Sequence, residues 1–236
     1  MAATCSIPAA AGRVTRVVAL ADTHAPRRWK SCPPLVAEQL RQADVILHAG
    51  DVCTAAVLDE LSEYAPVLAV AGNNDGPDVA AWGAKPTLLA DLGGLRVAMI
   101  HDSGAAPGRL RRLRRQFPGV DLVVFGHSHI PLDAEADGLR IFNPGSPTDR
   151  RRQPRGTVGV LRIEAAGWWP RTSSRSPEPG WEGIGVQRGE GTLAVPLATA
   201  WAPPHCCRCP ASQRKVACRA RISSRGRAGA RRAEAG

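Results

Sequence analysis

Seven side chains capable of binding metal ions stand at or just after the ends of short apolar runs in this sequence. They belong to aspartate, asparagine and histidine, whose oxygen and nitrogen atoms are ligands for divalent cations. A set that mixes imidazole with carboxylate suits Mn, Fe, Zn or Ni better than Ca. The seven candidate metal ligands are Asp22, His24, Asp51, Asn73, His101, His127 and His129.

Seven donors can hold two divalent ions if one carboxylate bridges them, and open positions then remain for water and substrate. Two ions about 3.5–4 Å apart can clamp the attacking and the leaving oxygen of a phosphoryl group. A hydroxide held between two cations forms near neutral pH because the metals lower the pKa of water. These residues therefore predict a hydrolase of phosphoester bonds that uses two divalent ions as cofactors and a metal-bridging hydroxide as nucleophile.

The first four candidate ligands follow a repeated strand–helix pattern. Residues 14–21 and 45–49 are continuous apolar runs typical of buried parallel strands, and a third strand begins at Pro66. Between them, residues 33–44 and 54–64 carry the apolar stripe of amphipathic helices. Parallel strands with right-handed crossovers collect ligands beyond their carboxyl ends. This rule predicts that the polar side chains after these strands meet at one end of a sheet.

The second half of the same domain is predicted to contain a hairpin, further strands and one helix. Gly93-Gly94, between two apolar runs, indicates a hairpin turn. Asn143-Pro144-Gly145-Ser146 is a turn by composition. The expected elements are a helical turn at 78–82, strands at 87–92, 95–100, 122–125, 139–142 and 157–163, and a helix at 108–116.

Two groups of arginines and one histidine carry weaker signals. The arginines of the 108–116 helix are expected to form a solvated face rather than a binding surface. His48 is predicted not to be a metal ligand itself, but either to support a ligand from behind or to be a structural histidine. The second arginine group could attract phosphate, although a solvated loop is the favoured interpretation; it consists of Arg150, Arg151, Arg152 and Arg155.

Composition divides the 236 residues into three parts. Residues 1–12 form an extension expected to be disordered, and residues 13–166 hold the catalytic domain. In residues 167–236 only seven side chains are Val, Ile, Leu, Phe or Met, whereas Gly, Pro and Ser account for 22, so disorder is predicted there too. The abrupt change after residue 166 is also what a frameshift or a mispredicted gene end would produce.

The net charge of +10 comes mostly from this tail. Residues 1–166 hold 19 Lys and Arg against 17 Asp and Glu, and residues 167–236 hold 12 against 4. A nucleic-acid partner bound through the tail is therefore a weakly supported alternative, which predicts salt-dependent binding. A zinc cluster of His205 with the neighbouring cysteines is not expected, because their spacing fits no zinc pattern.

The sequence lacks the patterns of a membrane span and of a secretory signal, and this determines the expected location. No stretch approaches the ~18 consecutive apolar residues of a membrane span, so no membrane partner is predicted. Residues 1–12 have no charged start followed by an apolar core, so a secretory signal is not expected. The cytoplasm is then the expected location, and the odd set of seven cysteines is expected to be reduced.

The ligand motifs resemble those of the calcineurin-like metallophosphoesterases, and most closely their small YfcE-like phosphodiesterase branch. Five blocks match in order within residues 13–166: Asp22-Thr23-His24, Gly50-Asp51, Gly72-Asn73, His101, and Gly126-His127-Ser128-His129. The resemblance implies an α/β fold, a four-layer α/β/β/α sandwich of two mixed sheets flanked by helices. It also implies that one metal takes Asp22, His24, Asp51 and His129, and the other takes Asp51, Asn73, His127 and His101, with Asp51 bridging.

Two positions depart from the family pattern. Asn74 stands where many larger relatives carry a histidine that protonates the leaving group or grips phosphate. An amide can donate a hydrogen bond but cannot supply a proton. We therefore predict Asn74 and Asp51 as the catalytic residues of a site that either favours diesters with good leaving groups or uses a metal-bound water as the acid. Asp102 stands where glycine is more usual, and either orients His101 or turns outward.

Other functions on the same fold stay open. The substrate is expected to be a small phosphoester, and a phosphomonoesterase is an alternative to a phosphodiesterase. A non-catalytic scaffold is the alternative from another class, because the retromer subunit that resembles this fold works chiefly as a protein-interaction platform. Intact ligand blocks weigh against the scaffold.

Overall fold

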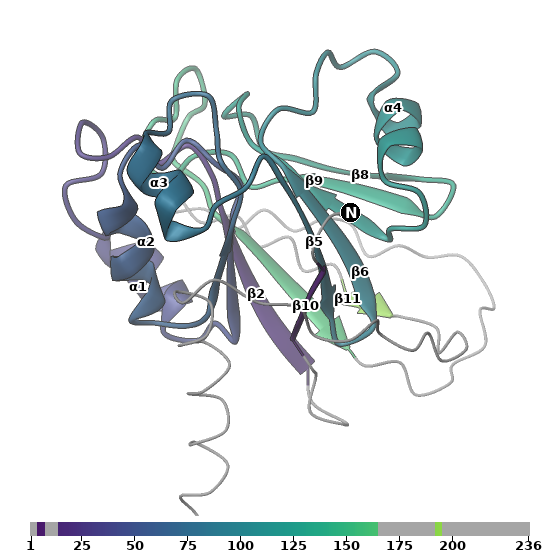
Figure 1. Ribbon diagram of the computed structural model, residues 1–236, viewed down its shortest axis with the longest axis horizontal. Helices are drawn as coiled ribbons and strands as arrows, with labels where there is room; N and C mark the ends of the chain where they lie inside the picture. Colours follow the sequence, from purple (N-terminus) through teal and green to yellow (C-terminus); the bar gives the residue numbers. More distant parts are fainter. Residues whose placement is uncertain (1–3, 8–13, 165–191, 195–236) are drawn as a thin grey trace, which may run out of the picture. The chain divides into compact units, whose positions relative to one another are not determined.

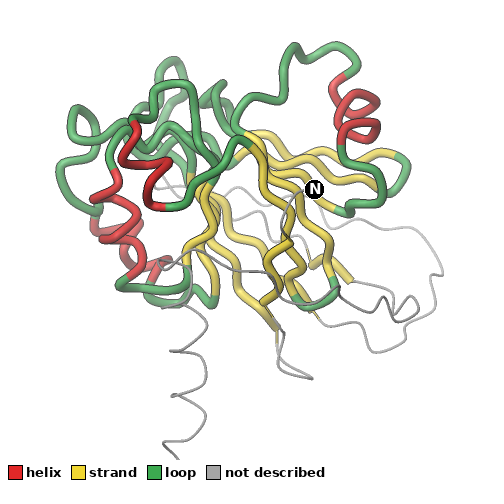
Figure 2. Tube along the Cα trace, viewed as in Figure 1, coloured by secondary structure: helices red, strands yellow, loops and turns green. Residues whose placement is uncertain are grey.

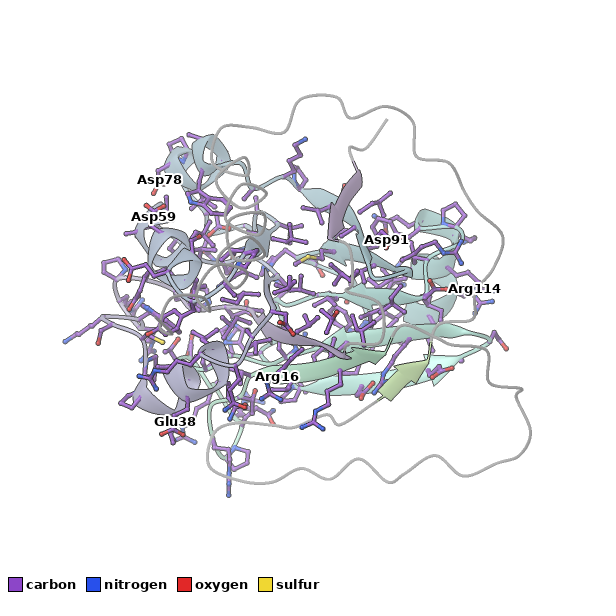
Figure 3. All side chains as sticks on the ribbon, turned by 90° about the horizontal axis from the view of Figure 1, so that it is seen from below. Arg16, Glu38, Asp59, Asp78, Asp91 and Arg114 are labelled. Atoms are coloured by element: carbon purple, nitrogen blue, oxygen red, sulfur yellow. The ribbon has the colours of Figure 1, made fainter. Side chains whose placement is uncertain are left out.

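The computed structural model describes residues 4–7, 14–164 and 192–194. All of them belong to one compact unit, Met1–Ala202. Two β-sheets form its centre, with helices on the outer faces (Figures 1 and 2). Charged side chains such as Glu38, Asp59 and Arg114 lie at the periphery, and apolar side chains fill the interior (Figure 3). No helix in the described part of the chain has the length and apolar character needed to span a membrane.

The first sheet contains the strands of the predicted strand–helix repeat. Its order is β11-β10-β2-β3-β4, in which β2, β3 and β4 are parallel and β10 is antiparallel to β2. The parallel strands place three loops at one end of the sheet, as expected from the pattern. The strands are β2 (Val14–Leu20), β3 (Val45–His48), β4 (Val67–Ala69), β10 (Gly159–Glu164) and β11 (Thr192–Ala194).

The second sheet has six strands in the order β1-β5-β6-β7-β9-β8. The predicted hairpin forms between β5 and β6, and β6, β7 and β9 are parallel. The carboxyl ends of β6 and β7 supply the remaining ligand loops. The strands are β1 (Thr4–Ile7), β5 (Thr87–Leu92), β6 (Leu95–Ile100), β7 (Leu122–Val124), β8 (Leu132–Ala136) and β9 (Leu139–Asn143).

Within the described residues, four helices cover the two sheets. In Figure 1, α1 (Pro34–Leu40), α2 (Ala55–Ser62) and α3 (Pro77–Trp82) lie on one side, and α4 (Arg109–Gln116) lies on the other. Proline at the first helical position starts α1 and α3, where its missing N–H has no partner to lose. α1, α2 and α4 are one to several residues shorter than the sequence predicted, and α3 begins one residue earlier, as is common at helix ends.

The alternation of side chains along β2 shows how the layers are held together. Val17 and Ala19 are buried between the two sheets, and Val18 and Leu20 are buried against the helices on the other face. This is the period of two that a strand imposes on its side chains. A third core joins α4 to the outer face of the second sheet through Leu113. Three apolar cores between four layers give the expected α/β/β/α sandwich.

Three strands have no counterpart in the sequence prediction. β8 pairs with β9 across Asp137-Gly138, a hairpin signal that its acidic, alanine-rich sequence obscured. β1 lies within residues 1–12, for which no regular structure was expected, and pairs in parallel with β5. β11 lies within the tail and pairs in parallel with β10. The predictions made for the rest of residues 1–12 and 167–236 fall outside the described residues.

Candidate metal centre

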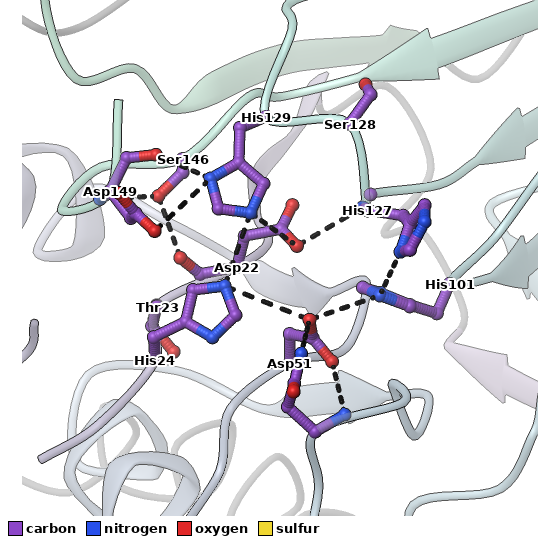
Figure 4. A network of polar contacts seen from close by, with 12 residues as sticks. Asp22, Thr23, His24, Asp51, His101, His127, Ser128, His129, Ser146 and Asp149 are labelled. Carbon is purple, nitrogen blue, oxygen red and sulfur yellow. Dashed lines mark hydrogen bonds and ion pairs between the residues drawn. The ribbon is translucent and has the colours of Figure 1, made fainter. Parts of the chain in front are cut away.

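All seven candidate ligands lie together where the strand ends of the two sheets meet. Asp22 and His24 follow β2, Asp51 follows β3, and Asn73 follows β4. The other sheet contributes the histidines after β6 and β7, and Figure 4 shows the rings of His101 and His129 beside Asp51 and Asp22. The strand-end rule alone predicted only the first of these two groups.

The ligand loops share an unusual backbone conformation. Asp22, His24, Asp51, His127 and His129 have φ values of 56°, 49°, 56°, 68° and 58°. Residues other than glycine pay roughly 1 kcal/mol or more in this left-handed region, and such residues concentrate at functional sites. Backbone hydrogen bonds between loops hold the conformation, for example from Asp22 N to Gly50 O at 2.9 Å and from His24 N to Asp51 O at 3.0 Å.

One group of ligand atoms gathers around His129. Its Nε2 lies 3.3 Å from Asp22 Oδ1 and 3.2 Å from His24 Nε2. The side chains of Asp22 and His129 are completely buried. Asp22 Oδ2 is also buried and has no hydrogen-bond partner among the described residues. A buried carboxylate oxygen without a partner is costly unless a cation completes the site.

A second group gathers around His101. Its Nε2 lies 3.1 Å from Asn73 Oδ1 and 3.3 Å from His127 Nδ1, and that nitrogen of His127 is 3.0 Å from the same amide oxygen. His101 is buried, whereas Asn73 and His127 are exposed. The second group is therefore open to solvent on one side.

Asp51 lies between the two groups. Its Oδ2 is 3.4 Å from His101 Nε2 and 3.8 Å from His24 Nε2. Two ligands bound at about 2.1 Å to one ion and at right angles to each other are about 3 Å apart. The nitrogen–nitrogen and nitrogen–oxygen separations of both groups are close to this value. Aspartate, histidine and amide atoms in this arrangement fit divalent cations.

Each of three histidines is fixed through the ring nitrogen that points away from the centre. Nδ1 of His101 lies 2.7 Å from Ala49 O, and Nδ1 of His129 lies 2.5 Å from Asp149 O. Nδ1 of His24 has a weaker partner, Cys53 Sγ at 3.6 Å. Such outer contacts set the tautomer and aim the other nitrogen at a metal. In all three rings that nitrogen is Nε2, at the centre.

Comparison with known proteins identifies the family. The sequence model of the calcineurin-like phosphoesterase superfamily domain matches residues 16–166. The chain belongs to this superfamily. A probable metallophosphoesterase of Methanothermobacter thermautotrophicus is 35% identical over 150 residues, which are 61% of this chain and 84% of that protein. Another of Methanocaldococcus jannaschii is 32% identical over 133 residues, 55% of this chain and 66% of that protein.

Solved structures agree on the fold of this calcineurin-like phosphoesterase domain. A crystal structure of Vps29 from Entamoeba histolytica is 25% identical, covers 59% of this chain and 81% of its own, and has a TM-score of 0.51. Vps29 from Cryptosporidium parvum has the same score at 24% identity, over 57% of this chain and 76% of its own. The family resemblance and the fold class that the motifs indicated are thereby confirmed.

The charge state of the phosphoesterase centre follows from its contacts. Burial alone would raise the pKa of the Asp51 carboxyl, but hydrogen bonds from His101 and Asn74 outweigh burial and hold that pKa well below its usual range. Burial alone would lower the pKa of His101 and His129. Their contacts with Asp51 and Asp22 reverse this, so both imidazole pKa values are raised. Asp51 is therefore ionised at neutral pH.

Asp75 was not predicted to have a role, and it joins two ligand loops. Its Oδ2 accepts hydrogen bonds from Gly72 N at 2.6 Å and Asp51 N at 3.2 Å, and its Oδ1 accepts one from Cys53 N at 2.6 Å. The Gly-Asn-Asn-Asp run has the composition of a turn closed by aspartate, which is the one local sign of this function.

The turn predicted at 143–146 supports the same loops from the other side. Ser146 Oγ donates to Asp22 O at 2.7 Å, and Asn143 Nδ2 donates to Gly126 O at 2.8 Å. Asp149, three residues on, holds His129 as described above and forms part of the network in Figure 4. A segment predicted as a structural turn therefore also positions the ligands.

Three further predictions can be compared with their surroundings. Asn74 donates from its backbone N to Asp51 Oδ1 at 2.9 Å and from Nδ2 to Asp51 Oδ2 at 2.7 Å, so it orients that carboxylate. Asp102 is exposed and accepts from Gly104 N at 2.7 Å, which is the outward alternative. His48 is fully buried beside Thr23, with Nε2 3.2 Å from Oγ1, as expected of a structural histidine.

Replacing His48 with glutamine is expected to flatten the pH dependence of stability below pH 6.5. Burial is the main cause that lowers the pKa of His48 from 6.5 to about 4. The unfolded chain therefore takes up the proton first, so this contribution to stability is complete above pH 6.5 and is lost as pH falls toward 4. At ~1.4 kcal/mol per pKa unit, the loss approaches about 3 kcal/mol.

Urea unfolding of the wild type and of His48→Gln at pH 7.5 and 4.5 measures this effect. The difference in unfolding free energy between the two pH values should be smaller in the variant. Equal differences in the two proteins would assign the acid sensitivity to other groups.

Proposed function

We propose that this calcineurin-like phosphoesterase is a dinuclear, metal-dependent phosphodiesterase. The observation that carries the proposal is the position of Asp51 between two groups of ligand atoms, each spaced like the ligands of one cation. Asp22, His24 and His129 would hold one ion with Asp51, and Asn73, His101 and His127 would hold the other with the same carboxylate. Mn, Ni, Fe and Zn suit this donor set.

Bound divalent ions would supply a nucleophile at neutral pH by lowering the pKa of water, and would draw charge from the phosphoryl oxygens. The residues of the chain keep the centre ready for this chemistry. Asn74 fixes both oxygens of Asp51, and the carbonyls of Ala49 and Asp149 fix the rings of His101 and His129. Because these groups are oriented before substrate arrives, little reorganisation is needed in the reaction.

The diester preference rests on Asn74. Both donors of this residue that contact the centre point to Asp51, and an amide has no proton to give to a leaving oxygen. An alkoxide leaving group would therefore depart unprotonated by this side chain. Esters whose leaving group is a stable anion, such as an aryl phosphodiester, are the substrates that such a site serves best.

Hydrolysis of bis(p-nitrophenyl) phosphate by the full chain is expected with added Mn²⁺ or Ni²⁺, and it should disappear after dialysis against a chelator. Restoring either ion should restore turnover. A parallel assay with p-nitrophenyl phosphate and with cyclic nucleotides distinguishes diester from monoester preference. Faster hydrolysis of the monoester would make the protein a phosphomonoesterase, and no turnover with any ion would refute the enzymatic proposal.

A protein-interaction scaffold is the second candidate, because Vps29 structures share the fold. The metal content of the purified protein separates the two. A scaffold need not retain metal or turn over any ester, whereas the enzyme should hold close to two ions per chain when they are supplied. Asp22 Oδ2, which is buried without a partner in the part of the chain that the structure describes, supports a bound cation, which the enzyme requires.

A further inference from the structure

An arginine loop lies directly beside the candidate metal centre. It consists of Arg150, Arg151 and Arg152, which follow Asp149 and are all exposed. The backbone oxygen of Asp149 is the atom that holds Nδ1 of His129. Arg151 therefore follows by two residues the backbone group that fixes the ring of His129.

A fourth arginine, Arg28, contacts Asp149 from the loop that follows β2. Arg28 N donates to His24 O at 2.8 Å, which closes a turn just after the first metal-binding motif. Arg28 Nε lies 3.9 Å from Asp149 Oδ1, and 49% of the Arg28 side chain is exposed. Arg28, Arg151 and Arg152 together form what we call the arginine rim.

The three positive charges of the rim exceed the negative charges that contact them. Over residues 4–7, 14–164 and 192–194, Arg151 and Arg152 form no hydrogen bond or ion pair. Arg150 differs, because its Nη1 donates to Gln153 O at 2.8 Å and thereby closes the loop on itself. Asp149 is the acidic partner of Arg28 at a long separation. Arg151 and Arg152 therefore have side chains without a partner among the described residues, just after the residue that holds His129.

We propose that the arginine rim binds a second phosphate of the substrate, in addition to the phosphoester that is hydrolysed. This inference rests on the proposed function and narrows its substrate class to small nucleotide-like phosphoesters that carry at least one further phosphate. Guanidinium groups are cations, and each can donate two parallel hydrogen bonds to the oxygens of an anionic phosphate. A substrate held at both phosphates is oriented as well as bound.

A small molecule fits the charge distribution better than a nucleic acid. Nucleic-acid binding draws on many phosphate contacts spread along a surface. Here the three rim arginines lie on two loops that the contact between Arg28 Nε and Asp149 Oδ1 brings together, and residues 1–166 as a whole are nearly balanced, with 19 basic and 17 acidic side chains. One extra phosphate is what a rim of this size can pair.

Two matched substrates test the rim. Both are 5′-p-nitrophenyl esters, one of thymidine 5′-monophosphate and the other of thymidine 3′,5′-bisphosphate. They release the same leaving group from the same 5′-diester, and they differ only in the free 3′-phosphate of the second. With the Mn²⁺-loaded full chain, KM for the bisphosphate ester should be lower by about 5- to 10-fold, as expected of two solvent-exposed ion pairs. The preference should shrink as salt is raised to about 1 M.

The double variant Arg151→Ala/Arg152→Ala should lose this preference and keep the rate on the monophosphate ester. Arg111→Ala/Arg115→Ala is the matched control, because both side chains are exposed on α4 and equally many positive charges are removed. The control should behave as the wild type. Equal KM values for the two esters in the wild type would overturn the rim and leave the proposed function intact.

A binding titration separates the two proposals if neither ester is hydrolysed. Thymidine 3′,5′-bisphosphate should bind the full chain more tightly than thymidine 5′-monophosphate, and the preference should be absent from Arg151→Ala/Arg152→Ala. That result without turnover would refute the phosphodiesterase and support the rim. Oligothymidylate that competes far better than the bisphosphate, through the same arginines, would assign the rim to nucleic acid and overturn the small-molecule proposal.

Discussion

Asp51→Asn is expected to reduce kcat/KM for an aryl phosphodiester by roughly 10³-fold or more, the scale of losing a principal electrostatic group. The carboxylate faces both ligand groups through Oδ2. An amide nitrogen at that position has no lone pair for a cation, and the substitution removes a negative charge from both proposed ion sites. The metal content of the variant, measured by elemental analysis, should fall with the rate.

The amide would also fit the centre poorly in either orientation. Asn74 donates from N to Oδ1 and from Nδ2 to Oδ2, so whichever atom of residue 51 becomes an NH2 group must face another donor. An unpaired donor of this kind costs about 1–3 kcal/mol. Unfolding free energy should therefore decrease modestly, and circular dichroism should show that the variant still folds.

Asp102→Asn is the matched control for this experiment. Asp102 is exposed next to His101, and its contact with Gly104 N can be made equally well by the amide oxygen of asparagine. Its rate and metal content should equal those of the wild type. If Asp51→Asn behaved like Asp102→Asn, the dinuclear proposal would be wrong.

The strand ends were the part of the site that physical rules could predict. Continuous apolar runs identified β2, β3 and β4 as parallel strands, and ligand groups collect beyond the carboxyl ends of such strands. Asp22, Asp51 and Asn73 therefore had to lie close together. Nothing in that rule brings in His101 or His127, because they belong to the other sheet. Only the family resemblance predicted that these two histidines lie beside the aspartates.

The supporting groups could not be predicted because they act over long separations in the sequence. Asp75 contacts the backbone of Asp51 24 residues away, and Ser146 contacts that of Asp22 124 residues away. The composition of the Gly-Asn-Asn-Asp run indicates a turn at Asp75, but no local pattern indicates these distant partners. The left-handed conformation of Asp22 and Asp51 is similarly hidden, because aspartate at the end of a strand is ordinary and its φ is set by the neighbouring loop.

The edge strand β8 shows a different limit. Its residues alternate only weakly between buried and exposed, and it contains Asp133 and Glu135 rather than β-branched residues. Intrinsic strand preference is low for such a sequence. The strand is stabilised by pairing with β9 instead. An ion pair between Asp133 and Arg140, 2.5 Å from Oδ2 to Nη2, also joins the two strands. Tertiary contacts thus stabilise a strand that intrinsic strand propensity does not predict.

Gly72→Ala is expected to disable the centre without altering any proposed ligand. A Cβ at this position would overlap the backbone N and Oδ1 of Asp51, and would lie 2.9 Å from its Cγ. The Asp51 carboxylate is fixed by Asn74 and His101, so it cannot move without losing those contacts. Overpacking of this kind costs about 1–3 kcal/mol, and displacement of Asp51 should lower turnover at least about 100-fold.

A second glycine substitution separates this steric effect from a general effect on folding. Gly138 has a φ of +77° in the β8–β9 turn, and a Cβ there would meet nothing within 4 Å. Gly138→Ala should lower the unfolding free energy by about 1 kcal/mol through its backbone alone, and should keep metal and activity. Gly72→Ala should lose metal under conditions in which both variants remain folded by circular dichroism. Metal retention and near-normal turnover in Gly72→Ala would mean that Asp51 is free to move, and the fixed carboxylate between two ions would have to be abandoned.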